Sequence, residues 1–159
     1  RIHPYAGSGT ITIGRSTHVR GELLTLPGGR ISIGDFAYVG EYSRIWSARS
    51  VEIGDRVLIA HGVTIVDNTT HPLNAEARHR HYRRILEVGH PADVDLRALA
   101  VRIEEDAWIA AHVVVLRGVT IGRGSVVGAG SVVVEDVPAG VLACGNPARV
   151  VRTLEGKAP

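Results

Sequence analysis

The feature that most constrains this 159-residue chain is an aliphatic residue that returns at every sixth position. Within each block of the repeat, these anchor residues are Ile or Val at every position except the last. The anchors are Ile13, Val19, Ile33, Val39, Ile45, Ile53, Ile59, Ile65, Ile103, Ile109, Val115, Ile121, Val127, Val133 and Ala139. A period of six fits neither an α-helix nor the simple alternation of a half-buried strand. Hexapeptide repeats are typical of a parallel β-helix, so we predict an all-β fold.

Each six-residue unit is expected to form one flat side of a three-sided coil. A short strand points its anchor inward, and a following Gly or other small residue lets the backbone turn the corner. Three sides complete a coil of about 18 residues, and neighbouring coils pair in parallel at ~4.8 Å. The early coils are spaced by 20 residues, which indicates an extra residue pair in each. The regular spacing from Ile103 through Ile121 to Ala139 predicts uninterrupted coils near the C-terminus.

The composition agrees with a core made of stacked aliphatic side chains. Aromatic residues make up 4% of the chain and Met is absent, so ring packing contributes little. The 19 Gly and 7 Pro residues argue against a helical bundle. The length fits one domain, and we expect residues 1–159 to form a single β-helix domain.

The six-residue rhythm is interrupted between Thr70 and about Ala100. Prolines and charged residues replace the anchors there, so we expect residues 71–100 to leave the coil as an excursion loop. A long loop that interrupts a strict repeat is typically functional, which makes this segment the first place to look for a site. The pattern decays again after Ala139. Residues 140–159 are therefore expected to form a C-terminal cap and tail that protect the last coil from edge pairing.

Several classes of protein fit the sequence poorly. The net charge is +2, and no Lys/Arg stripe alternates with aromatic residues, so we expect no nucleic-acid partner. No apolar run approaches the ~18 residues of a membrane span, and no secretory segment opens the chain. Cys144 is the sole cysteine, which excludes an intrachain disulfide and suits a reducing compartment. We expect a cytoplasmic protein.

Several segments resemble the hexapeptide-repeat acyltransferases, in particular the maltose and galactoside O-acetyltransferases and those that modify lipopolysaccharide or capsule. The similar segments are 57–60, 70–73, 107–112, 116–122, 127–133, 136–138 and 144–152. The resemblance implies a left-handed parallel β-helix and a homotrimer with sites between subunits. It also implies acetyl-CoA as the donor and a hydroxyl, less often an amine, on the acceptor. The handedness follows from the resemblance alone, because parallel crossovers are generally right-handed.

Acetyl transfer from a thioester to a hydroxyl needs a base that is neutral near pH 7, and it needs neither a metal nor a covalent enzyme intermediate. His71 is the candidate catalytic base, as the matching histidine is in the resembling family. Pro72 biases its backbone toward an extended conformation. A partner on the other ring nitrogen must orient the imidazole. Asp67, Asn68, Glu76 or a backbone carbonyl are open candidates for that partner.

The resemblance also assigns residues to the donor. The backbone amides of two alanines match contacts to the thioester and pantetheine parts of CoA, and two arginines match positions near the adenine end. A tryptophan matches a position that packs near the donor or the acceptor, and plain packing at a trimer interface is an equally open role for it. These donor-binding candidates are Trp108, Ala111, Ala129, Arg149 and Arg152. The sequence departs from the family at Val134-Glu135, where many members have Thr-Lys. An acid in place of a base predicts a weaker hold on the CoA phosphates, with Arg117 or Arg123 as possible substitutes.

The acceptor is expected to bind near the excursion. The substrate-binding candidates are Asp67, Asn68, His79 and His81. The sugar acetyltransferases carry an extra N-terminal helical segment with an acidic acceptor-binding residue. We expect this segment to be absent here, which disfavours simple maltose or galactosides. We expect a lipopolysaccharide, capsule or nucleotide-linked sugar instead.

Two other functions remain open on the same coil. A γ-type carbonic anhydrase holds zinc with three histidines, two of them five residues apart. Neither His61 nor His112 has a zinc ligand five residues on, where Val66 and Arg117 stand. A non-catalytic β-helix that mediates assembly is the second alternative, and it predicts no CoA binding.

Overall fold

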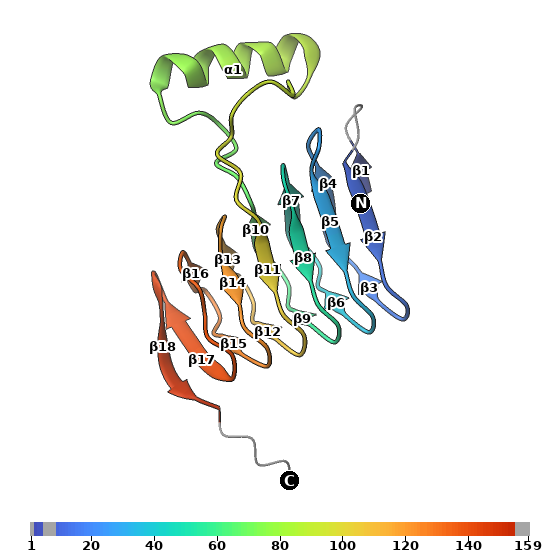
Figure 1. Cartoon of the computed structure of the whole chain (residues 1–159), viewed down its shortest axis with the longest axis vertical. Helices are drawn as coiled ribbons and strands as arrows, with labels where there is room; N and C mark the ends of the chain where they lie inside the picture. The colour runs from blue at the N-terminus through green and yellow to red at the C-terminus, as the bar shows by residue number, and fades with distance from the viewer. Residues whose placement is uncertain (1, 5–8, 155–159) are drawn as a thin grey trace.

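The computed structural model describes residues 2–4 and 9–154, whose strands form three sheets wound into one coil, parallel throughout except for the last strand (Figure 1). Sheet A contains β1 (Ile2–Pro4), β4 (Glu22–Thr25), β7 (Arg44–Ser47), β10 (Thr64–Val66), β13 (Val114–Val115) and β16 (Val132–Val133). Sheet B contains β2 (Thr10–Ile13), β5 (Arg30–Ile33), β8 (Val51–Ile53), β11 (Val101–Ile103) and β14 (Thr120–Ile121). Sheet C contains β3 (His18–Val19), β6 (Tyr38–Val39), β9 (Leu58–Ile59), β12 (Trp108–Ile109), β15 (Val126–Val127), β17 (Val141–Gly145) and β18 (Ala148–Thr153).

The predicted anchors stack in register and form the core. In sheet A, Ile45 pairs with Ile65, Ile65 with Val115, and Val115 with Val133, all at most 1% exposed. The other two sheets repeat this arrangement, so the described core consists of aliphatic side chains. The predicted all-β, left-handed parallel β-helix is confirmed.

The two ends of the repeat differ from the prediction. Ile13 is 41% exposed because β2 is the outermost described strand of sheet B. The expected anchor Ala139 is wrong: Ile121 pairs with Val137, which is buried, while Ala139 is exposed. The last coil is therefore two residues shorter than the 18-residue spacing predicted.

The excursion is present, but half of it is helical rather than a loop. Helix α1 (Ala75–Val88) lies beyond the carboxyl ends of the sheet A strands (Figure 1). The Asn74 side chain accepts a hydrogen bond from the Ala77 N–H (3.0 Å) at its start. At its end, Gly89 has φ 81° and donates its N–H to Ile85 O (3.0 Å). An N-cap Asn and a C-terminal Gly are helix signals that the sequence carried.

The C-terminal end of the coil is an antiparallel hairpin. Strand β17 continues sheet C in parallel with β15 and then pairs antiparallel with β18. The predicted cap thus takes the form of a reversed strand, while the predicted tail beyond residue 154 lies outside the described residues. In the described part of the chain, no helix is long and apolar enough to span a membrane.

Candidate active site

His71 lies where the chain leaves sheet A after β10. Its N–H donates to Thr69 O (2.6 Å), and its carbonyl accepts from the Thr69 hydroxyl (2.9 Å). Thr69 is held in turn by the returning end of the excursion, since its N–H donates to Leu96 O (2.9 Å). These bonds fix the turn that carries the half-buried imidazole of His71.

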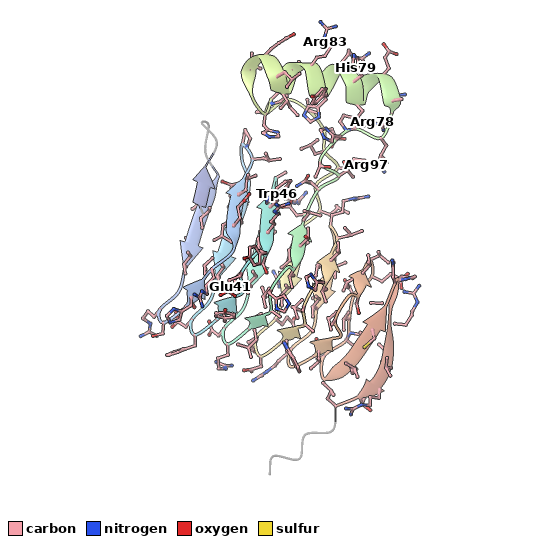
Figure 2. All side chains as sticks on the ribbon, turned by 180° about the vertical axis from the view of Figure 1, so that it is seen from behind. Glu41, Trp46, Arg78, His79, Arg83 and Arg97 are labelled. Atoms are coloured by element: carbon pink, nitrogen blue, oxygen red, sulfur yellow. The ribbon has the colours of Figure 1, made fainter. Side chains whose placement is uncertain are left out.

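A pocket of about 220 Å³ opens beside His71 on the outer face of sheet A. Leu24 and Trp46 come from β4 and β7 and give it an apolar side. Figure 2 shows Trp46 on the coil, below α1. The lining residues are Glu22, Leu24, Leu26, Trp46, Asn68, Thr70, His71 and His90. Neither Glu22 nor Trp46 was predicted at the acceptor site, because both lie on coils far from His71 in the sequence.

The orienting partner of His71 is a residue of α1. The Nδ1 atoms of His71 and His81 lie 3.2 Å apart, and the two rings meet at 67°. His81 is 3% exposed and is the one buried residue of α1. Burial lowers the pKa of His81, and the nearby His71 lowers it further. The sequence placed His81 at the substrate but did not anticipate this contact, which the helix creates.

Asp67 does not face the pocket. Its side chain is fully buried, and its carboxylate accepts hydrogen bonds from the Ser47 hydroxyl, from the N–H groups of residues 48–50 and from the Asn68 amide, at 2.7–2.9 Å. Asp67 was predicted to contact the substrate, but its side chain is buried and lines no part of this pocket. Asp67 instead ties the 47–50 turn to the root of the excursion.

The other residues predicted to bind the substrate or to orient His71 lie partly in the pocket and partly in solvent. Asn68 lines the pocket, and its side-chain oxygen accepts from the Thr70 N–H (2.7 Å). His79 is exposed on α1 and lines no part of this pocket. Glu76, a candidate partner for His71, forms an ion pair with Arg80 instead.

The donor candidates gather at sheet C and at its corner with sheet A. Trp108 is 50% exposed on β12. Ala111 and Ala129 lie at the same corner on successive coils, joined by a hydrogen bond from the Gly130 N–H to Ala111 O (2.9 Å). Among the described residues, no hydrogen bond uses the N–H of either alanine. Their small side chains leave these amides open to a ligand, whereas His61 carries a ring at the same corner one coil earlier.

The arginine candidates lie on the C-terminal hairpin. Arg149 and Arg152 are both exposed on β18. The guanidinium of Arg149 lies 3.4 Å from the Glu135 carboxylate, so the acid that departs from the family pattern pairs with a residue expected to hold phosphate.

The two groups of candidates do not meet within one chain. Ala111 precedes β13, whereas His71 follows β10, the strand paired with β13. Because these strands are parallel, the two residues lie at opposite ends of sheet A. The histidine and the donor-side amides are thus separated by the width of one face of the coil.

Two histidines outside the excursion lie close together. His61 and His112 make an edge-to-face ring contact with centroids 5.0 Å apart. Within residues 2–4 and 9–154, no three His, Cys, Asp or Glu side chains are placed to hold one metal ion. The pair lies at the corner between sheets C and A, away from His71.

Comparison with known proteins gives matches along most of the chain. The family model described as bacterial transferase hexapeptide (six repeats) matches residues 100–134. The chain is 35% identical to the galactoside O-acetyltransferase of Escherichia coli K12 over 92% of its own length and spans 65% of that protein. It is 58% identical over 55 residues to a 2,3,4,5-tetrahydropyridine-2,6-dicarboxylate N-acetyltransferase of Clostridium perfringens, 35% of this chain and 23% of that protein.

A solved structure is similar over nearly the whole chain. It is a hexapeptide-repeat acetyltransferase from Vibrio cholerae O1 biovar eltor in complex with acetyl coenzyme A. The two chains superpose with a TM-score of 0.74 at 32% identity, covering 91% of this chain and 72% of the other.

Proposed function

Because the chain belongs to the hexapeptide-repeat acetyltransferase family, we propose that it transfers an acetyl group from acetyl-CoA to a sugar hydroxyl. The acceptor class is a nucleotide sugar or another precursor of a surface polysaccharide. The observation that carries the proposal is His71, whose Nδ1 is held by His81 beside a pocket, while Nε2 has no hydrogen-bond partner among the described residues. A histidine held in this way is equipped to act as a general base.

The proposed reaction is a direct transfer in a ternary complex. Nε2 of His71 removes the proton of the acceptor hydroxyl as that oxygen attacks the thioester carbonyl. The Ala111 N–H stabilises the oxyanion of the tetrahedral intermediate. When the C–S bond breaks, the proton on His71 passes to the CoA thiolate, so the imidazole returns neutral. No residue forms a covalent intermediate.

The proposed site is shared between subunits of a homotrimer. His71 and Ala111 lie at opposite ends of sheet A, so one chain supplies the base and its neighbour the donor side. An apolar row on the outer face of sheet C supports assembly. It consists of Tyr38, Leu58, Trp108, Val126 and Leu142, which pair in register. Leu58 and Trp108 are each 50% exposed and lie next to each other in this row, and contiguous exposed apolar surface is typical of a protein–protein interface.

Donor phosphates are proposed to bind Arg149 and Arg152 on the hairpin, with Trp108 and the Ala129 amide along the pantetheine. Guanidinium groups suit phosphate recognition because their planar arrangement of N–H groups can donate two parallel hydrogen bonds to one phosphate. We propose a cytoplasmic location for the protein, because acetyl-CoA is available to the reaction there.

The decisive experiment follows acetyl-CoA turnover as free thiol with a panel of nucleotide sugars, surface-polysaccharide sugars and amino sugars. We expect His71→Ala to reduce kcat by about 10²- to 10⁴-fold. The exposed Glu87 on α1 provides the control, and Glu87→Ala should leave kcat unchanged.

The outcomes of this experiment distinguish the proposed function from its alternatives. Full turnover in His71→Ala would remove His71 as the base. Transfer to amino sugars alone would favour N-acetylation, the chemistry named for the Clostridium relative that is similar over 55 residues. If no acceptor supports turnover and CoA does not bind, the chain is a non-catalytic assembly module.

A further inference from the structure

Helix α1 contacts the rest of the molecule through an unusual residue. A helix that packs on a protein normally buries a stripe of aliphatic side chains. In α1 the buried residue is His81, whereas Tyr82, Leu86 and Val88 are between 51% and 73% exposed. The buried position therefore holds a polar imidazole. This indicates that His81 contributes mainly through its hydrogen bond to His71 and less through burial of apolar surface.

The hydrogen bond between the two histidines restricts their tautomers. With the Nδ1 atoms 3.2 Å apart, one nitrogen carries the hydrogen and the other offers a lone pair. A base that accepts a proton at Nε2 must carry its own hydrogen at Nδ1. His71 is then the donor, and His81 is the acceptor, with its own hydrogen at Nε2.

We propose that His81 is a positioning residue for His71: its Nδ1 lone pair accepts the His71 Nδ1–H and holds the base in the tautomer whose Nε2 is free for the acceptor hydroxyl. This assignment rests on the proposed function, since it concerns the base of that reaction. His81 acts through His71 and does not touch the reacting atoms.

The surroundings of the pair favour the neutral form of His81, which is the form that can accept a hydrogen bond. Burial lowers the pKa of His81, and positive charge on His71, His90 and Arg84 acts in the same direction. The carboxylate of Asp93 accepts two hydrogen bonds from the Arg84 guanidinium, at 2.9 and 3.0 Å. Asp93 therefore forms an ion pair with Arg84 and is not the partner of His81.

Among the residues that the structure describes, no carboxylate forms a hydrogen bond with the His71 ring. Asp67 is enclosed by the 47–50 turn, and Glu76 pairs with Arg80. A neutral acceptor has a chemical consequence, because it stabilises the imidazolium of His71 less than a carboxylate would. The proton therefore leaves His71 more readily for the thiolate of CoA.

Two substitutions separate the hydrogen bond from packing. His81→Asn keeps an acceptor oxygen near the position of Nδ1, and His81→Phe keeps a ring but removes the acceptor. We expect His81→Phe to lower kcat about 10- to 100-fold with little change in KM for acetyl-CoA, because the wrong tautomer of His71 is populated. His81→Asn should retain kcat within about threefold, and Glu87→Gln on the exposed side of α1 should match the wild type.

Nitrogen-15 NMR of the ring nitrogens reports the tautomer independently of turnover. The His71 signals are assigned by their loss in His71→Gln. We expect protonated Nδ1 and bare Nε2 on His71 in the wild type and in His81→Asn, and a shift toward protonated Nε2 in His81→Phe. Thermal unfolding of each variant separates a change of tautomer from a loss of folding.

The outcomes distinguish this inference from the function on which it rests. Protonated Nε2 on wild-type His71, or equal kcat losses in His81→Asn and His81→Phe, would overturn the role of His81. Unchanged turnover in His71→Ala would instead overturn the proposed function. If no acceptor is found, the NMR experiment alone decides the direction of the hydrogen bond.

Discussion

At the scale of single residues, Glu135 is the side chain expected to lower the affinity of the proposed donor site for the phosphates of acetyl-CoA. Its carboxylate lies 3.4 Å from Arg149, and both groups are more than half exposed, so the pair itself adds little stability. Its charge nevertheless opposes a phosphate that approaches Arg149. We expect Glu135→Lys to lower the KM for acetyl-CoA about two- to fivefold without changing kcat. Steady-state kinetics test this, with Glu87→Lys on α1 as the matched charge control. A higher KM in Glu135→Lys would contradict it.

Asp67 illustrates how a buried carboxylate serves the site indirectly. Removing it leaves the Ser47 hydroxyl and the N–H groups of residues 48–50 without their acceptor. We expect Asp67→Ala to reduce the free energy of unfolding by about 2–5 kcal/mol. Chemical denaturation measures this loss, and the exposed Glu87→Ala should change stability by at most about 0.5 kcal/mol. Equal stability of the two variants would show that the 47–50 turn does not depend on Asp67.

At the scale of elements, α1 has a pH-sensitive attachment. Burial lowers the pKa of both His81 and His90 from 6.5, so the unfolded chain binds protons more readily than the folded one. Stability is therefore fully present above about pH 6.5 and declines as the pH falls toward the folded pKa values. The carboxylates whose pKa is lowered, such as Asp93, begin from 3.8 and act in a more acidic range.

The expected result is a loss of hydrogen-exchange protection in the amides of α1 between about pH 7.5 and pH 5, after correction for intrinsic exchange rates. His81→Asn should show a smaller loss, because it removes one of the two titrating rings. His18→Asn provides the control and should behave as the wild type. Protection that stays constant over this range in the wild type would contradict the prediction.

The elements also show what a sequence can and cannot reveal. The anchors predict the coil because every inward position of the repeat needs an aliphatic side chain, and this need returns at a fixed spacing in the sequence. The helix was missed because its buried residue is His81, which leaves no apolar stripe, although Asn74 and Gly89 marked its ends. His71 was found from its neighbours in the chain. Its contact with His81 depends on the direction in which α1 leaves the turn, and no local pattern encodes that direction.

At the scale of the whole molecule, the separation of His71 from Ala111 makes a prediction about mixed assemblies. His71→Ala and Ala111→Phe should each be inactive, the second because its ring covers the corner amide. Randomly mixed trimers of the two should recover about a quarter of wild-type turnover, since each site needs one intact residue from each of two neighbours. Refolding the chains together and measuring thiol release tests this. A mixture that stays inactive would contradict the shared site.

The excursion leaves and rejoins the coil at adjacent points. The Thr69 N–H donates to Leu96 O (2.9 Å) and the Leu99 N–H to Asp67 O (2.8 Å), while Val51 and Val101 pair across the gap as ordinary neighbours. An insertion closed in this way can change in length or composition without disturbing the coils on either side. Substitutions or insertions within the excursion can therefore alter the proposed acceptor pocket while the coils that carry the proposed CoA-binding residues stay unchanged.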